Sequence, residues 1–280
     1  MLELPDVEVL RKDLEKEVVG KRVKDVTVGS TGIVRAFHRN RPELVKALEG
    51  RKIEAVRRRG HTLFIDLDDE HTWVIDPGAE GTLFRETATA ELGPQTHLSV
   101  SFTTGGAIHL AEPGDEPTAS TGVVATEGAY EAAGVNPDAL DPLDDNPTWM
   151  EFGRFLAAAS KPLKLLLIDP QHVVGIGPVY SDEILWEAGL RHDHPSDKLS
   201  TQEVRRFYRA MHEVLFLAMK QVGATLDEAD PGETTDEDEI ADHLKVFGRD
   251  GLPCFRCRRP IVRTRLKKGV YTYHCERCMI

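Results

Sequence analysis

The stretch LKLLLIDPQHVVGIGPVYSDEILWEAGL, residues 163–190, is the most informative part of the chain. At its centre the tight turn Gly175-Ile176-Gly177-Pro178 separates two helical runs, and proline is well tolerated in the first turn of a helix. Exposed amides at such a turn and helix N-terminus form a ready anion site, suited to a DNA phosphate. A G-x-G turn alone is weak evidence, because two packed core helices explain it equally well.

The C-terminal end contains two C-x-x-C pairs, Cys254 with Cys257 and Cys275 with Cys278, separated by seventeen residues. This spacing can place four thiolates tetrahedrally around one zinc ion. Two disulfides are the alternative, but the sequence shows no secretory signal, and paired knuckles favour a metal. Between the pairs, β-forming residues flank residues 267–269, which predicts a hairpin. Because about 30 residues cannot fold by core burial alone, we expect one structural zinc.

Composition sets the limits of the remaining chain. With 280 residues, 40% of them hydrophobic, the protein can bury a substantial core and divide into two or more domains. No apolar run approaches the length of a membrane span, so we expect a soluble, cytoplasmic protein. Residues 227–242 are rich in acids and predict a mobile linker. Ahead of them, the pattern from Ser200 to Glu203 predicts a capping box that starts an amphipathic helix.

Charge is distributed unevenly. The whole chain has a formal charge of −12, yet residues 251–280 carry eight Lys or Arg against one acidic residue, which gives +7 there and leaves −19 elsewhere. A basic terminus on an acidic body suggests a local contact with a polyanion, although a solvated basic hairpin is the simpler alternative.

Three landmarks together carry a resemblance: MLELPDVE at residues 1–8, the stretch 163–190, and VFGRDGLPC at residues 246–254. In this order, and with the paired cysteines, they resemble the formamidopyrimidine-DNA glycosylase/endonuclease VIII family over essentially the whole chain. The resemblance implies an α+β multidomain fold. Its expected parts are an N-terminal two-layer β-sandwich with a leading helix (1–135), a helix–two-turn–helix domain (136–226), an acidic linker (227–245) and a zinc hairpin (246–280).

The resemblance also implies a chemistry for the first residues. In the family, Met is removed and the exposed proline amine attacks C1′ of a flipped-out damaged nucleotide, forming a Schiff base. Here Leu2 replaces that proline, so we expect Met1 to be retained and the lyase step to be weakened or lost. Glu3 stands at the family's acid/base position, and Asp6 replaces its second glutamate. A monofunctional enzyme could use Glu3 to activate water.

Other departures affect the expected DNA contacts. The family's hairpin lysine is His61, its H-L-G-M-x-G strand reads Asp76 to Gly81 with Ala79 for methionine, and the phosphate-binding asparagine is Pro178. The D-x-R-x-F-G motif is absent from its expected place, where the chain reads HLAEPGDEPTAS. The family's zinc-hairpin arginine aligns with Val270, and one extra residue in this loop makes Lys268 the candidate substitute. The following residues are our expected DNA-binding set: His61, Lys164, Gly175, Gly177, Tyr180, Arg265, Lys267 and Lys268.

Three functions remain open at this stage. The first is a DNA glycosylase of base-excision repair acting on damaged or abasic duplex DNA, nucleoid-associated and monomeric. The second is a non-catalytic binder of such DNA. The third is a scaffold repurposed for a protein or small molecule. The −19 body favours the third because it repels duplex DNA, whereas the +7 hairpin favours the first two.

Overall fold

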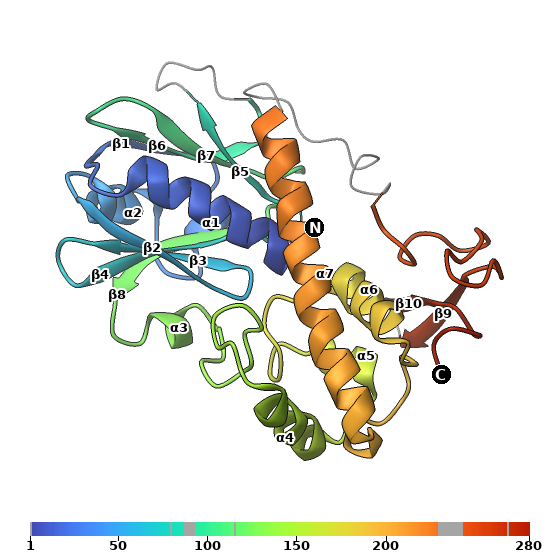
Figure 1. The fold of residues 1–280 in the computed structure, drawn as a ribbon. Helices are drawn as coiled ribbons and strands as arrows, with labels where there is room; N and C mark the ends of the chain where they lie inside the picture. Colours follow the sequence, from blue (N-terminus) through green and yellow to red (C-terminus); the bar gives the residue numbers. More distant parts are fainter. Residues whose placement is uncertain (1, 79, 87–92, 115, 229–242, 268) are drawn as a thin grey trace. The chain divides into compact units, whose positions relative to one another are not determined.

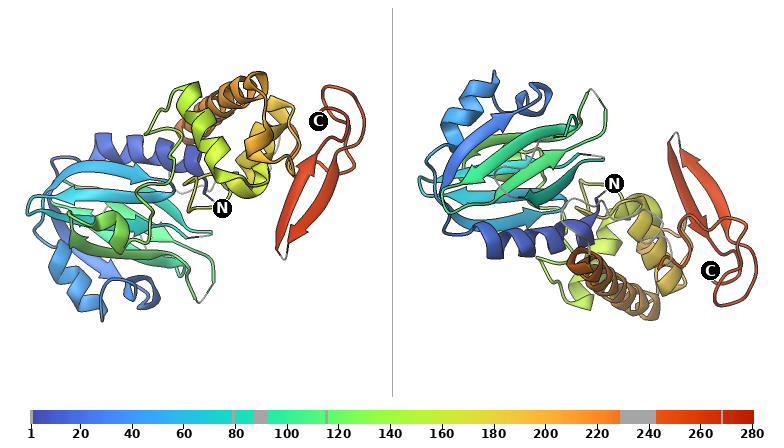
Figure 2. Two further views of the ribbon diagram at one scale, coloured as in Figure 1. Left: turned by 90° about the horizontal axis from the view of Figure 1, so that it is seen from below. Right: turned by 90° about the horizontal axis from the view of Figure 1, so that it is seen from above.

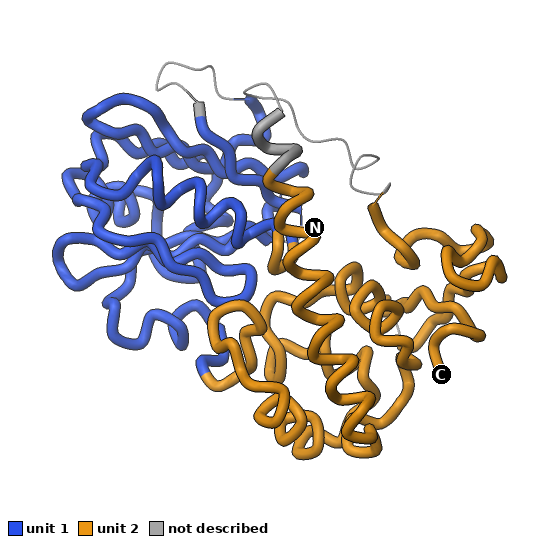
Figure 3. The backbone as a smooth tube through the Cα atoms, in the orientation of Figure 1, with its two compact units in different colours: residues 1–2, 6–137, 228–234 blue, residues 3–5, 138–227, 235–280 orange. Residues whose placement is uncertain are grey.

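The computed structural model describes residues 2–78, 80–86, 93–114, 116–228, 243–267 and 269–280, so most of the expected acidic linker lies outside the described residues. Two compact units are distinguished, each described by itself (Figure 3). Unit 1 comprises residues 1–2, 6–137 and 228–234, and unit 2 comprises residues 3–5, 138–227 and 235–280. Among the described residues, no helix is both long and apolar enough to cross a membrane.

Unit 1 is built on two antiparallel sheets of four strands each, seen as two layers in Figure 1. Buried side chains of both sheets meet in one core, which includes Ile65, Trp73 and Val100. The first sheet has the order β1 (Val23–Val28), β6 (Thr96–Phe102), β7 (Ala107–Ala111), β5 (Thr82–Glu86). The second has the order β2 (Ile53–Arg59), β3 (Thr62–Leu67), β4 (His71–Asp76), β8 (Ser120–Ala125).

Helices complete unit 1. The apolar face of the first helix adds Val7, Leu14 and Val18 to the sandwich core, as helical spacing of apolar residues requires. Asn40 caps the second helix by accepting a hydrogen bond from the Glu43 amide. The helical segments are α1 (Leu4–Val18), η1 (Gly32–Val34), α2 (Arg41–Leu48) and α3 (Ala129–Ala132).

Unit 2 contains the helical domain, with α4 (Trp149–Ala159), α5 (Leu163–Leu167), α6 (Pro178–Ala188), η2 (Ser196–Lys198) and α7 (Thr201–Glu228). The expected capping box before α7 is present: Ser200 Oγ accepts from the Glu203 amide at 3.3 Å, and the Glu203 carboxylate accepts from the Ser200 amide at 2.7 Å. The core of this unit is made by α4 to α7, and Phe152 and Phe207 meet edge to face in it.

The C-terminal part of unit 2 is a two-stranded hairpin, β9 (Val262–Lys267) and β10 (Val270–His274), which both views of Figure 2 show clearly. The sequence prediction of a hairpin between the cysteine pairs is therefore confirmed. The α+β class, with an N-terminal sandwich, a helical domain and a cysteine-bearing hairpin, is confirmed as well.

Candidate active site and nucleic-acid interface

Glu3 is held at the N-terminus of α6. Its side chain is buried, and its carboxylate accepts hydrogen bonds from the amides of Gly177 (2.9 Å), Val179 (2.8 Å) and Tyr180 (3.1 Å). The first amides of a helix lack partners within the helix and carry a partial positive charge, so they stabilise an anion. The anion site that the sequence predicts at this turn is thus occupied by the protein's own carboxylate.

The two glycines of the turn make this approach possible. A Cβ atom at Gly177 would lie 2.5 Å from Oε1 of Glu3, so any larger residue would displace the carboxylate. Gly175 has φ +84°, a conformation that favours glycine, and its carbonyl accepts from the Leu4 amide at 2.8 Å. Tyr180 is buried in the core of unit 2. Three residues expected to bind DNA therefore build a socket for residues 3 and 4.

Lys164 is fully buried, although it was expected at a DNA contact. Its Nζ lies 2.7 Å from Oδ1 of Asp182 and donates to the Pro178 carbonyl at 2.8 Å. Burial lowers the pKa of Lys164, whereas the attraction of Asp182 and of Glu3 raises it. Burial likewise raises the pKa of Asp182, and Lys164 opposes that shift. Lys164 thus joins α5 to α6 inside the unit.

The hairpin is fastened to α6 by two consecutive carboxylates. Asp182 also accepts from Thr272 Oγ1 at 2.6 Å and from the Tyr273 amide at 2.9 Å, both on β10. Glu183 accepts from the amides of residues 245–247, each at 2.9 Å, in the segment that leads into the cysteine module. Burial raises the pKa of Glu183, and the three amides counteract the shift. One helix therefore carries both the Glu3 socket and the hairpin.

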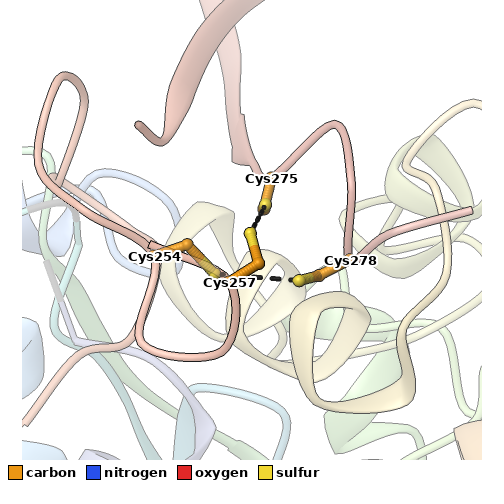
Figure 4. Close-up of side chains that lie close together, drawn as sticks. All are labelled: Cys254, Cys257, Cys275 and Cys278. Carbon is orange, nitrogen blue, oxygen red and sulfur yellow. Dashed lines mark hydrogen bonds between the residues drawn. The ribbon is translucent and has the colours of Figure 1, made fainter. Parts of the chain in front are cut away.

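The four cysteines converge at the base of the hairpin (Figure 4), and all four are free of disulfides. Their sulfur atoms lie within 4.8 Å of one another, so they could hold one metal ion. Burial alone would raise the pKa of the Cys254 thiol, but the amides of Cys257 and Arg256 lower it to about 6. Amide donors that favour a thiolate are what a metal-binding knuckle requires.

One face of β9 presents a row of cations. Arg263, Arg265 and Lys267 are exposed at alternate positions, so they project from the same face of the strand. The Arg263 guanidinium lies 4.0 Å from the ring centre of Tyr271 on β10, a cation–π contact that restrains it. Lys268 lies outside the described residues. Arg263 was missed by the sequence reasoning, although strand alternation would have grouped it with Arg265 and Lys267.

His61 lies on the turn between β2 and β3, beside the end of β4. Its Nε2 lies 3.6 Å from Oδ2 of Asp76, and their side chains are 47% and 30% exposed. The Asp76 carboxylate, as an acceptor for the ring N–H, raises the pKa of His61, although burial opposes the shift. The sequence analysis named both positions separately and did not predict their contact. The contact follows from the antiparallel register of β3 and β4, because Leu63 pairs with Ile75 and this places His61 near Asp76.

The other expected catalytic positions lie at the beginning of the chain. Leu2 is partly buried and packs against the sandwich core of unit 1. Asp6 is partly buried in the first turn of α1, where a negative charge suits the helix dipole. Met1 lies outside the described residues, as does Ala79.

Comparison with known proteins gives concordant matches. The family described as the formamidopyrimidine-DNA glycosylase N-terminal domain matches residues 1–114, and that family's H2TH domain matches residues 139–229. Formamidopyrimidine-DNA glycosylase of Enterococcus faecalis is 32% identical over 99% of this chain and 97% of its own length. The same-named protein of Moorella thermoacetica is 31% identical over 95% of each chain.

Solved structures show the same fold. Fpg of Lactococcus lactis, in complex with DNA that contains an abasic site, superposes with a TM-score of 0.84 at 24% identity, covering 99% of both chains. MutM in complex with DNA containing carbocyclic 8-oxo-G gives a TM-score of 0.83 at 23% identity, again covering 99% of both. From the matched domains and the full-length relatives, the chain belongs to the formamidopyrimidine-DNA glycosylase family.

Proposed function

We propose that this protein binds duplex DNA containing a damaged or abasic nucleotide in base-excision repair, and that it excises the base with a weakened Schiff-base lyase step. Family membership supports the substrate class, since solved relatives are complexes with abasic or Fapy-dG-containing DNA. Such a role would place the protein in the cytoplasm, at the nucleoid.

The row Arg263, Arg265 and Lys267 on β9 is the observation that carries the binding proposal. Aligned cations neutralise successive phosphates and release counterions, and an acidic protein must concentrate such contacts on one element. Asp182 and Glu183 secure this hairpin to α6, so the row is presented by a rigid support. His61 is the corresponding proposed contact from unit 1.

We further propose that the four cysteines hold one zinc ion. Four sulfur donors within 4.8 Å of one another suit Zn²⁺ and would leave no open coordination position, so the ion would stabilise the hairpin and take no part in the reaction. Backbone amides directed at Cys254, which favour its thiolate, support the same assignment.

The weakened lyase step is proposed from Leu2. A retained Met1 moves the terminal amine one residue, about 3.5 Å of chain, from the position that a terminal proline would take. The Leu2 side chain packs against the unit 1 core, which restrains the backbone there. Because amine attack needs an approach of about 3–3.5 Å, a shift of this size is expected to be costly.

A salt-dependent gel shift tests the binding proposal. We expect the wild type to prefer a duplex with an abasic analogue to an undamaged duplex. Arg265→Gln should weaken both complexes and reduce the salt slope by about 1. Arg154→Gln, at a 78% exposed position on α4, is the matched control and should change neither. Equal, salt-independent binding by all three proteins would contradict the proposal.

A further inference from the structure

Base excision without a covalent amine step needs a group that accepts a proton from water. Glu3 is poorly placed for this role, because three amides occupy its oxygens and its side chain is only 2% exposed. A carboxylate in such a socket is a weak base, since hydrogen bonds to the charged form favour it. The proton acceptor must therefore be sought elsewhere.

Histidine–carboxylate contacts are the natural candidates, and His61 differs from the others in the described residues. His71 and His172 contact Asp69 (3.1 Å) and Asp169 (3.3 Å), which lie two or three residues away in the same local turn. The contact between His61 and Asp76 instead joins the turn between β2 and β3 to the end of β4. It is thus a product of the tertiary fold.

The side chain of Asp76 is held in place by the backbone of the turn that follows it. Its Oδ1 accepts from the Gly78 amide at 2.9 Å, and Gly78 has φ +73°. A Cβ at Gly78 would lie 2.6 Å from the Ala119 amide nitrogen, so this turn packs tightly against the residue that precedes β8. Behind Ala119, the buried carboxylate of Glu112 accepts from that same amide at 2.7 Å and from Thr118 Oγ1 at 2.5 Å. These contacts fix the position of the Asp76 carboxylate, which can therefore orient the His61 ring.

Other charges near the turn are already engaged. Arg58 of β2 donates to the Gly60 carbonyl at 3.0 Å and to Glu8 of α1 at 3.0 Å, so the turn also lies beside the first half of α1. Arg59 donates to the Pro137 carbonyl at 2.9 Å, and Glu80 is exposed four residues after Asp76. Asp76 is the charged group that shifts the pKa of His61.

We propose that His61, oriented by Asp76, is the general base of a hydrolytic base excision; this inference rests on the proposed function. Asp76 faces Nε2 and so places the proton there, which leaves the lone pair on Nδ1. No group among the described residues bonds to Nδ1, and the ring is half exposed.

The reaction step balances without a cofactor. Nδ1 of His61 takes a proton from a water molecule as the water oxygen forms a bond to C1′ of the damaged nucleotide. The C1′–N bond breaks, its electron pair leaves with the base, and the base gains a proton from solvent. The products are a free base and an abasic site, and the protein forms no covalent bond to DNA.

Single-turnover release of the base tests this role, with duplexes that contain Fapy-dG or 8-oxoguanine as probes. His61→Gln should slow release about 10²–10⁴-fold, the usual range for a lost general base, which is a far larger change than the loss of affinity for an abasic-analogue duplex from its proposed DNA contact. His71→Gln, at the exposed first residue of β4, is the matched control and should keep the wild-type rate.

The pH profile separates a base from a structural residue. The wild-type rate should rise with pH through the raised pKa of His61, because only the neutral ring accepts a proton. Asp76→Asn should move this rise to lower pH, since it removes the group that raises the pKa.

Three outcomes would overturn the inference: an unchanged rate in His61→Gln, a profile that Asp76→Asn does not move, or no base release by a wild type that binds the abasic duplex. Failure of the wild type to bind any damaged duplex would instead overturn the proposed function.

Discussion

Replacing Gly177 by alanine isolates the steric requirement of the Glu3 socket. Gly177 has φ −106° and ψ −162°, which alanine adopts without strain, so the backbone itself does not resist the change. The new Cβ, however, would lie 2.5 Å from Oε1 and 2.6 Å from Cδ of Glu3, too close for any non-bonded pair. The carboxylate must therefore move away from its amides.

The size of the effect follows from the bonds that are lost. Three charge-assisted hydrogen bonds hold the carboxylate, and each contributes about 1.5–3 kcal/mol. Full loss of one and weakening of the others should reduce the free energy of unfolding of unit 2 by about 3 kcal/mol. For a unit of this size, that corresponds to a fall in Tm on the order of 10 °C.

Thermal unfolding and hydrogen exchange measure the result. We expect lower Tm and faster exchange of the amides of residues 177, 179 and 180 in Gly177→Ala. Gly223→Ala, in an open position on α7, is the matched control and should raise stability by about 0.5–1 kcal/mol. An unchanged Tm and unchanged exchange in Gly177→Ala would refute the socket. If DNA affinity alone fell, the amides would belong to a phosphate.

The pKa of Glu8 is pushed up by burial but lowered overall by Arg11 and Arg58, so its stabilising effect on unit 1 is present above pH 4.5 and lost as pH falls through the lowered value. Glu8→Gln should remove that acid limb of the unfolding curve, and a curve of unchanged shape would contradict the pairing. Cys257→Ser or a strong chelator should release one zinc per chain, detectable by elemental analysis, and raise exchange in residues 254–278; full protection without metal would contradict a zinc role. Lys164→Met should leave the buried Asp182 unpaired and lower the stability of unit 2 by about 3–5 kcal/mol without changing the salt slope of DNA binding, whereas a reduced slope would indicate a phosphate contact.

Local patterns predicted the elements of the fold well. The capping box before α7, the turn at Gly175–Pro178 and the hairpin between the cysteine pairs follow from short-range rules and are present as expected. Such features depend on neighbouring residues, which a sequence displays directly.

Long-range partners could not be read in the same way. The turn at Gly177 predicts an anion, but nothing near it indicates that the anion is Glu3, 174 residues earlier. Lys164 carries the charge typical of a surface residue, and its burial depends on an ion pair with Asp182. Asp182 lies on the next helix and also accepts a hydrogen bond from Thr272 on β10. Side-chain type predicts chemistry, whereas the fold determines which partner that chemistry meets.

The central claim is that the protein binds abasic DNA but has little Schiff-base activity, and borohydride trapping tests it most directly. A duplex with a natural abasic site is incubated with the protein, and half of each sample is reduced while the other half is run as a gel shift. Intact mass first establishes whether Met1 is retained, as we expect. We predict a salt-dependent complex with little covalent product, and more product from Leu2→Pro, which allows Met removal. Efficient trapping by the wild type that is lost on blocking the α-amine would contradict the account.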